Sequence, residues 1–346
     1  MAKSNWSYLQ GERRTGEYEE MTVRSIGHWW MGENSGWPDA VRNGYHLFSE
    51  TGVGMIEPTA LVINDPSAYR DRHKLTYRSY VLQQDAEEKK LDALLEGARK
   101  RGTFALIKMP ASIRRAYIPA LRHYFWGSGM MRIYAAAYTP CGPVMNTLLF
   151  QIFDCMRHAQ RFVELSWDVN QDASVDSLSM WLDWQPLQPT RRYVETGLSL
   201  FDWGETFVAV NYVFDPVFLP LHDILVADIP EQAGDWAITQ FWQLLAEDLQ
   251  RHKVSGCDFV AAMIEESGDN MEVIQGWVNR WLPMALQAID ALAPLVEEAR
   301  SLGYPRSYPS IRDEILSAYE GQLARNGLVL PSHIGEFHES KASISG

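Results

Sequence analysis

The sequence predicts an all-α protein. Alternation of apolar and polar residues with a period of two, typical of a half-buried strand, is scarce in the 346 residues. From about residue 65 onward, apolar residues recur instead at the helical spacing of three and four. Prolines, glycines and capping residues fall between these segments, where helices begin and end. The three observations together indicate a chain of long helices.

Residues 1–66 differ from the rest of the chain. This segment is rich in Gly and Trp, shows no sustained period, and is too apolar for an ordinary disordered tail. We expect a long irregular N-terminal arm that lies on another surface, such as another subunit. An irregular cap on its own domain is an equal alternative on this feature alone.

The first helices are expected between residues 65 and 170. Asp65 and Pro66 resemble an N-cap followed by proline at the first helical position. The polar run 83–102 has acids early, bases late and a closing glycine, as the helix dipole prefers. Prolines set off two further helices at 111–138 and 142–170.

The second half begins near Thr190, after the segment QPLQPT. Residues 190–214 and 233–252 are predicted as two long helices, and residues 267–303 as a third. Asp269 with Glu272 fits a capping box at the start of this third helix.

The third helix keeps its apolar residues on one face. They are Ile274, Trp277, Val278, Trp281, Ala285, Ile289, Leu292, Leu295 and Ala299. Pro283 and Pro294 are expected to kink this helix rather than end it. The tail, residues 326–346, is predicted to be irregular.

Composition narrows the class of protein. The net charge is -13 with no long basic run, which disfavours nucleic acid as a partner. Three cysteines form no disulfide framework and fit a reducing compartment. The first residues lack the apolar core of a signal peptide, and no stretch approaches the length of a membrane span. We expect a cytoplasmic protein without a membrane partner.

One five-residue pattern, D-x-x-R-H, occurs twice in helical surroundings. The first copy runs from Asp154 to His158 and the second from Asp248 to His252. Because positions i and i+3 share a helix face, Cys155 and His158 lie along one apolar row. Leu249 and His252 lie along a similar row in the second copy. Both histidines are therefore expected to point toward the interior.

A helix bundle that binds two irons takes a Glu-x-x-His pair from each of two helices and a single Glu from each of two others. In such proteins the motif often reads D-E-x-R-H, and its Asp orients a ligand His. Here Cys155 and Leu249 stand where the two glutamates belong. No Asp or Glu occurs between Glu96 and Asp154, so residues 111–138 cannot supply a carboxylate.

Iron in such a bundle depends on these carboxylates. We therefore predict a vestigial di-iron site that binds no metal, and no catalytic residue in this chain. Two alternatives remain. The repeated pattern is accidental, each copy being an ordinary set of helix pairs, or Cys155 and His158 bind zinc with ligands not evident in the sequence.

Three segments give the chain a family resemblance. Arg191–Leu221 resembles a pattern Y-V-E…D-W-x-E…N…D…P-L, and Phe259–Ala299 resembles a late helix pair with a W-x-x-x-W-x-P core. Residues 70–89 match the region that opens the first helix. With the two degraded motifs, these segments resemble the β subunit of the hydroxylase component of bacterial multicomponent monooxygenases. The family includes methane, phenol, toluene, alkene, propane and tetrahydrofuran monooxygenases, and the likeness spans roughly residues 65–325.

The resemblance implies a ferritin-like (ribonucleotide-reductase-like) helical domain over residues 67–325 that contains the vacated di-iron site. It implies a homologous α subunit that carries the di-iron centre, in an (αβ)2 or (αβγ)2 assembly with a second αβ protomer. A small regulatory protein and a reductase with NADH, FAD and a 2Fe-2S cluster would serve the complex. Trp29, Trp30 and Trp37 in the arm become candidate anchors on the α subunit.

The resemblance also implies how the motif residues pair. In active relatives each motif Asp serves the His of the other motif, so Asp154 is expected near His252 and Asp248 near His158. Arg157 and Arg251 would complete a buried structural polar cluster, while Cys155 and Leu249 fill part of the remaining space. The resulting function would be a non-catalytic scaffold of a hydrocarbon monooxygenase. The alternatives are a freestanding ferritin-like di-iron oxidase with unusual ligands and an unrelated all-α interaction protein.

Overall fold

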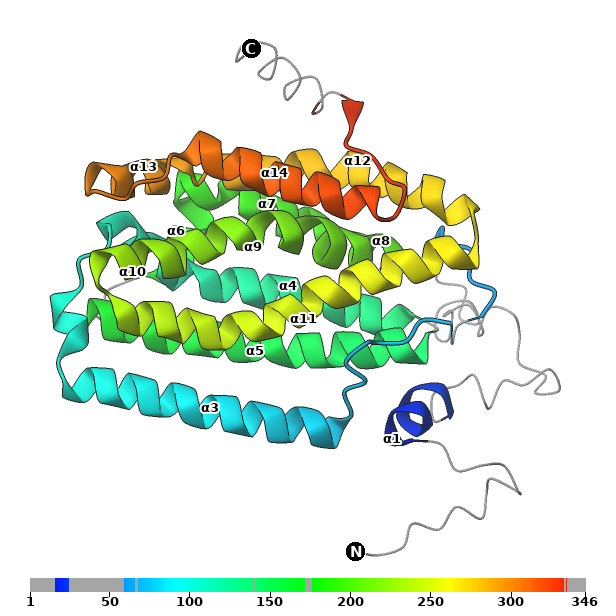
Figure 1. Ribbon diagram of the computed structural model, residues 1–346, viewed down its shortest axis with the longest axis horizontal. Helices are drawn as coiled ribbons and strands as arrows, with labels where there is room; N and C mark the ends of the chain where they lie inside the picture. The colour runs from blue at the N-terminus through cyan, green and yellow to red at the C-terminus, as the bar shows by residue number, and fades with distance from the viewer. Residues whose placement is uncertain are drawn as a thin grey trace, which may run out of the picture.

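The computed structural model describes residues 16–24, 59–65, 68–139, 141–171, 176–332 and 334, and all regular secondary structure in these ranges is helical (Figure 1). This confirms the all-α prediction. Most of the predicted arm, including Trp29, Trp30 and Trp37, lies outside the described residues. None of the helices in the described part is long and apolar enough to cross a membrane.

Four long helices contribute to the centre of the bundle. They are α3 (Tyr77–Lys100), α4 (Ile118–Tyr138), α5 (Gly142–Asn170) and α11 (Trp236–Glu266). A continuous helical run joins α8 (Trp203–Phe207), the π-helical turn η6 (Val208–Phe214), α9 (Asp215–Asp223), the π-helical turn η7 (Ile224–Asp228) and α10 (Ile229–Ala233). The remaining helices are α1 (Glu17–Glu19), α6 (Ser177–Asp183), α7 (Gln188–Gly197), α12 (Asp269–Asp290), α13 (Ala293–Ser301) and α14 (Tyr308–Ala324).

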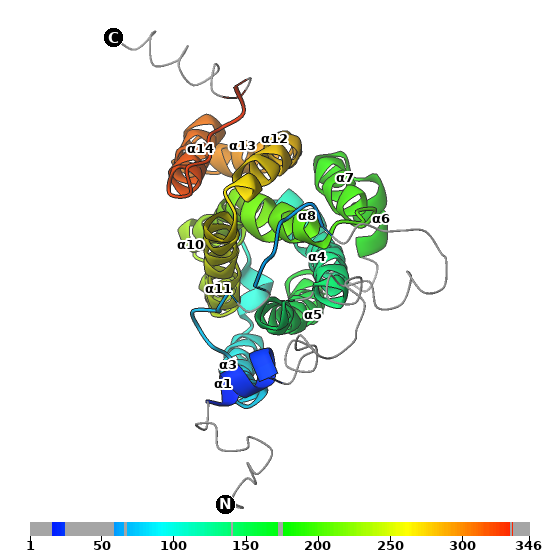
Figure 2. The same cartoon turned by 90° about the vertical axis from the view of Figure 1, so that its right-hand side faces the viewer.

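The segments α4, α5, α11 and η6 surround the centre of the bundle. α4 packs along α5, and α11 packs against α3, α5 and η6. α3 lies on one side of this group and α12, α13 and α14 lie on the other, as both views show (Figures 1 and 2). The nine apolar residues predicted to share one face of the 267–303 segment are all buried.

The first helix starts later than the sequence predicted. Residues 68–76 are not helical, and α3 begins at Tyr77. Thr76 caps it, because its hydroxyl oxygen accepts from the Ser79 amide at 3.3 Å. The Asp65 amide donates instead to Glu266 at 2.7 Å, which ties this segment to the end of α11. The N-cap predicted at Asp65 is therefore wrong, because the helix begins at Tyr77 with Thr76 as its cap.

The predicted helix 190–214 is broken in the structure. α7 ends at Gly197, and Asp202 starts α8 by accepting from the Glu205 amide at 2.9 Å. The other carboxylate oxygen of Asp202 accepts from the Ala60 amide at 2.7 Å. The Asp202 side chain thus caps α8 and also binds the segment that precedes α3. The periodicity of the local sequence does not reveal this long-range contact.

The predicted helix 267–303 is also two helices. α12 ends at Asp290, and Pro294 lies in the first turn of α13, where its missing N–H is not needed. Pro283 lies inside α12 as expected, but Pro294 does not kink a continuous helix. The Asp269–Glu272 capping box is wrong as well, since the N-cap is Gly268 and makes no side-chain cap.

Gly256 on α11 sets how closely that helix approaches η6. A Cβ at this position would lie 2.5 Å from the backbone oxygen of Asn211, which cannot move as a side chain would. Gly256→Ala should lower the free energy of unfolding by about 1–3 kcal/mol through overpacking, measured by chemical denaturation.

The matched control is Gly276→Ala on α12. Gly276 is exposed inside a helix, and a Cβ there meets nothing within 4 Å. Because glycine is a poor helix former, this variant should gain about 0.5–1 kcal/mol. Equal effects of the two substitutions would contradict the close approach.

Candidate functional site

The two D-x-x-R-H motifs meet across α5 and α11. His158 Nε2 lies 3.1 Å from Asp248 Oδ2, and His252 Nε2 lies 2.9 Å from Asp154 Oδ2. All four side chains are buried. The structure therefore brings together both crossed pairs that the sequence predicted.

Both motif histidines are neutral. Burial lowers the pKa of His158, and it lowers the pKa of His252 well below its usual value. A neutral ring that donates from Nε2 to a carboxylate leaves Nδ1 as a lone-pair acceptor. Neither Nδ1 atom has a hydrogen-bond partner. This is the arrangement in which an imidazole can ligate a metal, so the histidines alone do not exclude one.

The two motif arginines also bind the motif carboxylates. Arg157 pairs with Asp248 and lies 2.7 Å from Glu88 on α3, and Arg251 Nη2 donates to Asp154 at 3.0 Å. Two carboxylates and two guanidinium groups thus balance one another around the two neutral rings. A buried cluster of this kind is tolerable only because its charges are paired.

α3 also supplies polar groups that the sequence reading did not assign. The Tyr80 hydroxyl donates to Asp154 at 2.8 Å, and Gln84 Nε2 donates to Asp248 at 2.9 Å. The pKa values of the two carboxyls are shifted in opposite directions. Burial and the charge of Asp248 raise the pKa of Asp154 to about 6. Burial also raises the pKa of Asp248, but His158, Arg157 and Arg251 outweigh it and hold that pKa below its usual range.

A second buried ion pair joins α4 to the start of α9. Arg132 Nη2 on α4 lies 2.5 Å from Asp215 Oδ2 at the start of α9, and both residues are 1% exposed. Arg132 also donates to Asn211 Oδ1 at 3.0 Å and Gln151 Oε1 at 3.1 Å, and the Tyr124 hydroxyl donates to Asp215 at 3.0 Å. The guanidinium is therefore held from α4, α5, η6 and α9 at once.

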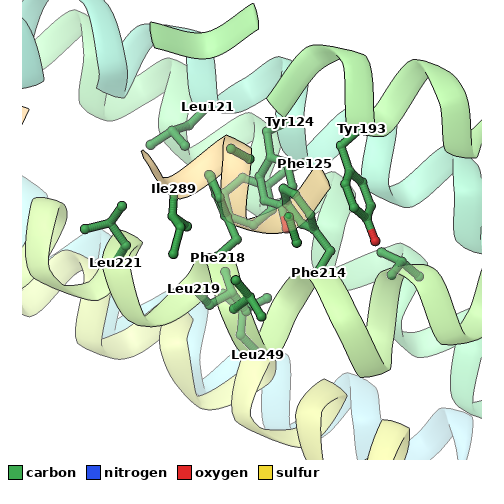
Figure 3. Close-up of a cluster of buried hydrophobic side chains, with 14 of the residues drawn as sticks. Leu121, Tyr124, Phe125, Tyr193, Phe214, Phe218, Leu219, Leu221, Leu249 and Ile289 are labelled. Carbon is green, nitrogen blue, oxygen red and sulfur yellow. The ribbon is translucent and has the colours of Figure 1, made fainter. Parts of the chain in front are cut away.

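The Arg132–Asp215 pair lies close to the two D-x-x-R-H motifs. The charge of Arg132 is felt by both His252 and Cys155, as is the charge of Asp215. Burial raises the pKa of the Cys155 thiol to about 12, so it stays neutral. Leu249 packs into the apolar cluster beside Leu219 (Figure 3). The two positions that replace the motif glutamates thus carry no charge.

The donor set does not fit two irons. Such a centre needs inward carboxylates from all four helices. Here α5 and α11 offer a neutral thiol and a leucine, and α4 offers the fixed cation of Arg132. Asp215 is inward-facing, but it is committed to that cation. Within the described ranges, no group of three or more His, Cys, Asp or Glu side chains is placed to hold a metal ion.

Sequence reasoning missed Arg132, Asp215 and the contributions of α3. Asp215 and Asn211 lie inside the segment Arg191–Leu221 that carries the family resemblance, but no role was inferred for them. Arg132 lies in a helix that contains no Asp or Glu. An arginine with no acidic residue nearby in the sequence was the signal that could have indicated a distant ion-pair partner. His222 is fully buried, and its Nδ1 lies 2.8 Å from the Tyr117 hydroxyl.

Solved structures share this fold. Phenol hydroxylase from Pseudomonas sp. OX1 aligns with a TM-score of 0.76 and 20% identity, covering 93% of this chain and 94% of that chain. Toluene 4-monooxygenase aligns with a TM-score of 0.70 and 22% identity, covering 86% and 99%. The class is therefore the ferritin-like helical fold of these hydroxylases, which confirms the predicted fold class.

Sequence relatives define the family. Residues 37–267 match the family described as Methane/Phenol/Alkene Hydroxylase, and the chain belongs to that family. The hydroxylase component subunit beta of the toluene-4-monooxygenase system of Ectopseudomonas mendocina is 26% identical over 327 residues, spanning 90% of this chain and 96% of the relative.

Two relatives come from one enzyme, the phenol 2-monooxygenase of Pseudomonas sp. (strain CF600). Its oxygenase component DmpL is 26% identical over 280 residues, spanning 78% of this chain and 80% of the relative. Its oxygenase component DmpN is 24% identical over 229 residues, spanning 63% and 43%. The chain is thus related to two different components of a single monooxygenase.

The Arg132–Asp215 pair should show strong coupling in a double-mutant cycle. Arg132→Met and Asp215→Asn each leave a buried charge without its partner, and each should cost about 3–5 kcal/mol of unfolding free energy. The double variant should cost clearly less than the sum, because no lone charge remains. Additivity within about 0.5 kcal/mol would show that the two groups do not depend on each other.

His222 should make stability depend on pH. Burial is the main cause that lowers the pKa of His222 to about 3. In the unfolded chain the ring titrates near ~6.5, so its contribution is full above that pH and is lost as pH falls toward 3. Between pH 6 and 4 the unfolding free energy should fall faster in the wild type than in His222→Phe, by about 1.4 kcal/mol per pH unit.

The comparison isolates His222 from Asp154. The raised pKa of Asp154 stabilises the folded state at low pH and loses that effect as pH rises through about 6, the opposite direction. This effect is common to both proteins and cancels in their difference. Parallel pH curves for the wild type and the variant would contradict a buried, uncharged His222.

Proposed function

We propose that this chain is the non-catalytic β-type subunit of a soluble di-iron monooxygenase hydroxylase. It would scaffold a homologous α subunit that carries the iron, in an (αβ)2 or (αβγ)2 assembly in the cytoplasm. The assembly would insert one oxygen atom from O2 into a hydrocarbon, with electrons from NADH supplied by a reductase. A small regulatory protein would act on the complex.

The donor set of the bundle centre carries this proposal. Where a di-iron site needs four inward carboxylates, the chain has Cys155, Leu249, Arg132 and an Asp215 neutralised by Arg132. Bringing a dication beside a fixed guanidinium is electrostatically unfavourable in a low-dielectric interior. The crossed His–Asp pairs would then serve folding, not chemistry.

The relatives support the same assignment. One relative, of which this chain spans 96%, is named a hydroxylase component subunit beta. The chain spans 80% of one phenol 2-monooxygenase component but only 43% of the other. A role as one of two homologous components fits this pattern better than a freestanding oxidase does.

Iron content tests the proposal. The chain is expressed alone in iron-replete medium, and iron per chain is measured by elemental mass spectrometry. We expect well under one iron per chain, because the centre lacks the ligands. The homologous iron-bearing subunit, expressed and purified in parallel, is the positive control. Two tightly held irons in this chain would overturn the proposal in favour of a di-iron enzyme with unusual ligands.

A further inference from the structure

Two apolar stripes lie exposed on neighbouring helices. On α4 the stripe consists of Trp126, Met130 and Ile133, which recur at spacings of four and three and so share one helix face. On α5 it consists of Leu149, Phe153, Val163 and Trp167, also along one face. Trp126 is 58% exposed and Trp167 is 59% exposed. We call these seven residues the α4–α5 face.

The two stripes belong to one continuous surface. α4 and α5 lie side by side in both views and are joined by a short link, so they run antiparallel (Figures 1 and 2). At the seam, a Cβ on Gly129 would lie 3.2 Å from Cys155 Cβ, so the helices approach closely. Arg132 and Cys155 occupy the inward side of that seam. Both exposed stripes therefore flank its outward side.

The α4 part of this face has an unusual charge for the chain. The net charge is -13, yet no Asp or Glu occurs between Glu96 and Asp154, a range that includes all of α4. The exposed charged residues that continue the α4 stripe are Arg115 and Arg122. On α4, apolar residues, tryptophan, methionine and arginine occur without acids, which is the composition of an interface core. On α5, Glu164 follows Val163 and is paired with Arg99 and Arg161. Exposed contiguous apolar patches mark interaction sites in the same way.

We propose that the α4–α5 face binds the corresponding helices of the homologous iron-bearing subunit. This inference rests on the proposed function. Two components of one phenol 2-monooxygenase are both similar to this chain, so one enzyme contains two chains of this family. Homologous chains can pair through a pseudo-two-fold axis, each using the same surface, as identical chains do through a true one.

Charge distinguishes this partner from a second copy of the chain. A second copy would present the same acid-free α4, which has no carboxylate for Arg115 and Arg122. Two chains with a net charge of -13 would also repel each other. The partner's face should therefore carry Asp or Glu residues opposite the two arginines, around an apolar centre that receives the two tryptophans.

The test uses the chain co-expressed with the homologous iron-bearing subunit. Trp126→Glu and Phe153→Glu place a charge on the face, and Leu302→Glu is the control, since Leu302 is 65% exposed after α13. Circular dichroism and melting temperature establish that each variant folds, and light scattering after size exclusion gives the mass and the dissociation constant. Both face variants should bind at least about 30-fold more weakly, the effect of losing an interface hot spot, and the control should bind like the wild type.

The other outcomes separate the two proposals. If the wild type assembles and the face variants assemble equally well, the face is wrong while the proposed function stands. If the wild type does not bind the homologous subunit, the proposed function fails and the face assignment fails with it. If the wild type forms a homodimer that Trp126→Glu disrupts, the face is an interface but its occupant is a second copy, which overturns the proposal.

Discussion

The Arg132–Asp215 ion pair is the constraint on which the centre of the bundle depends. It places a full positive charge, 1% exposed, among α4, α5, η6 and α9. Such a charge is costly to bury unless its partners are fixed, and here Asp215, Asn211 and Gln151 all accept from it. Four of the segments at the centre, α4, α5, η6 and α9, therefore contribute to holding one guanidinium. A bundle organised around this cation is a poor host for further cations.

The crossed His–Asp pairs form a second set of contacts, which joins α5 to α11. Asp154 and Asp248 each bind the histidine of the other motif, so α5 and α11 are joined twice. Tyr80 and Gln84 connect α3 to the same carboxylates. Hydrogen bonds and paired charges thus hold the interior of the bundle together. On their outward sides, α4 and α5 carry the exposed apolar stripes.

Sequence reasoning succeeded where local periodicity decides the structure. It predicted the helix 142–170 to the residue, because its apolar rows are long and proline marks its start. It placed the His–Asp pairs because the repeated pattern matched a family frame. It failed at Asp202 and Asp65, whose backbone or side-chain bonds reach residues 142 and 201 positions away. Arg132 and Asp215 were missed for the same reason, since 83 positions separate them and only the tertiary fold pairs them.

Diffraction at the iron absorption edge tests the central claim most directly. Crystals of the chain, grown anaerobically with excess Fe(II), would be measured on both sides of the edge. The account predicts no anomalous peak between His158 and His252, with the Arg132 guanidinium bound to Asp215. Two peaks between α5 and α11, with Arg132 displaced from Asp215, would contradict it.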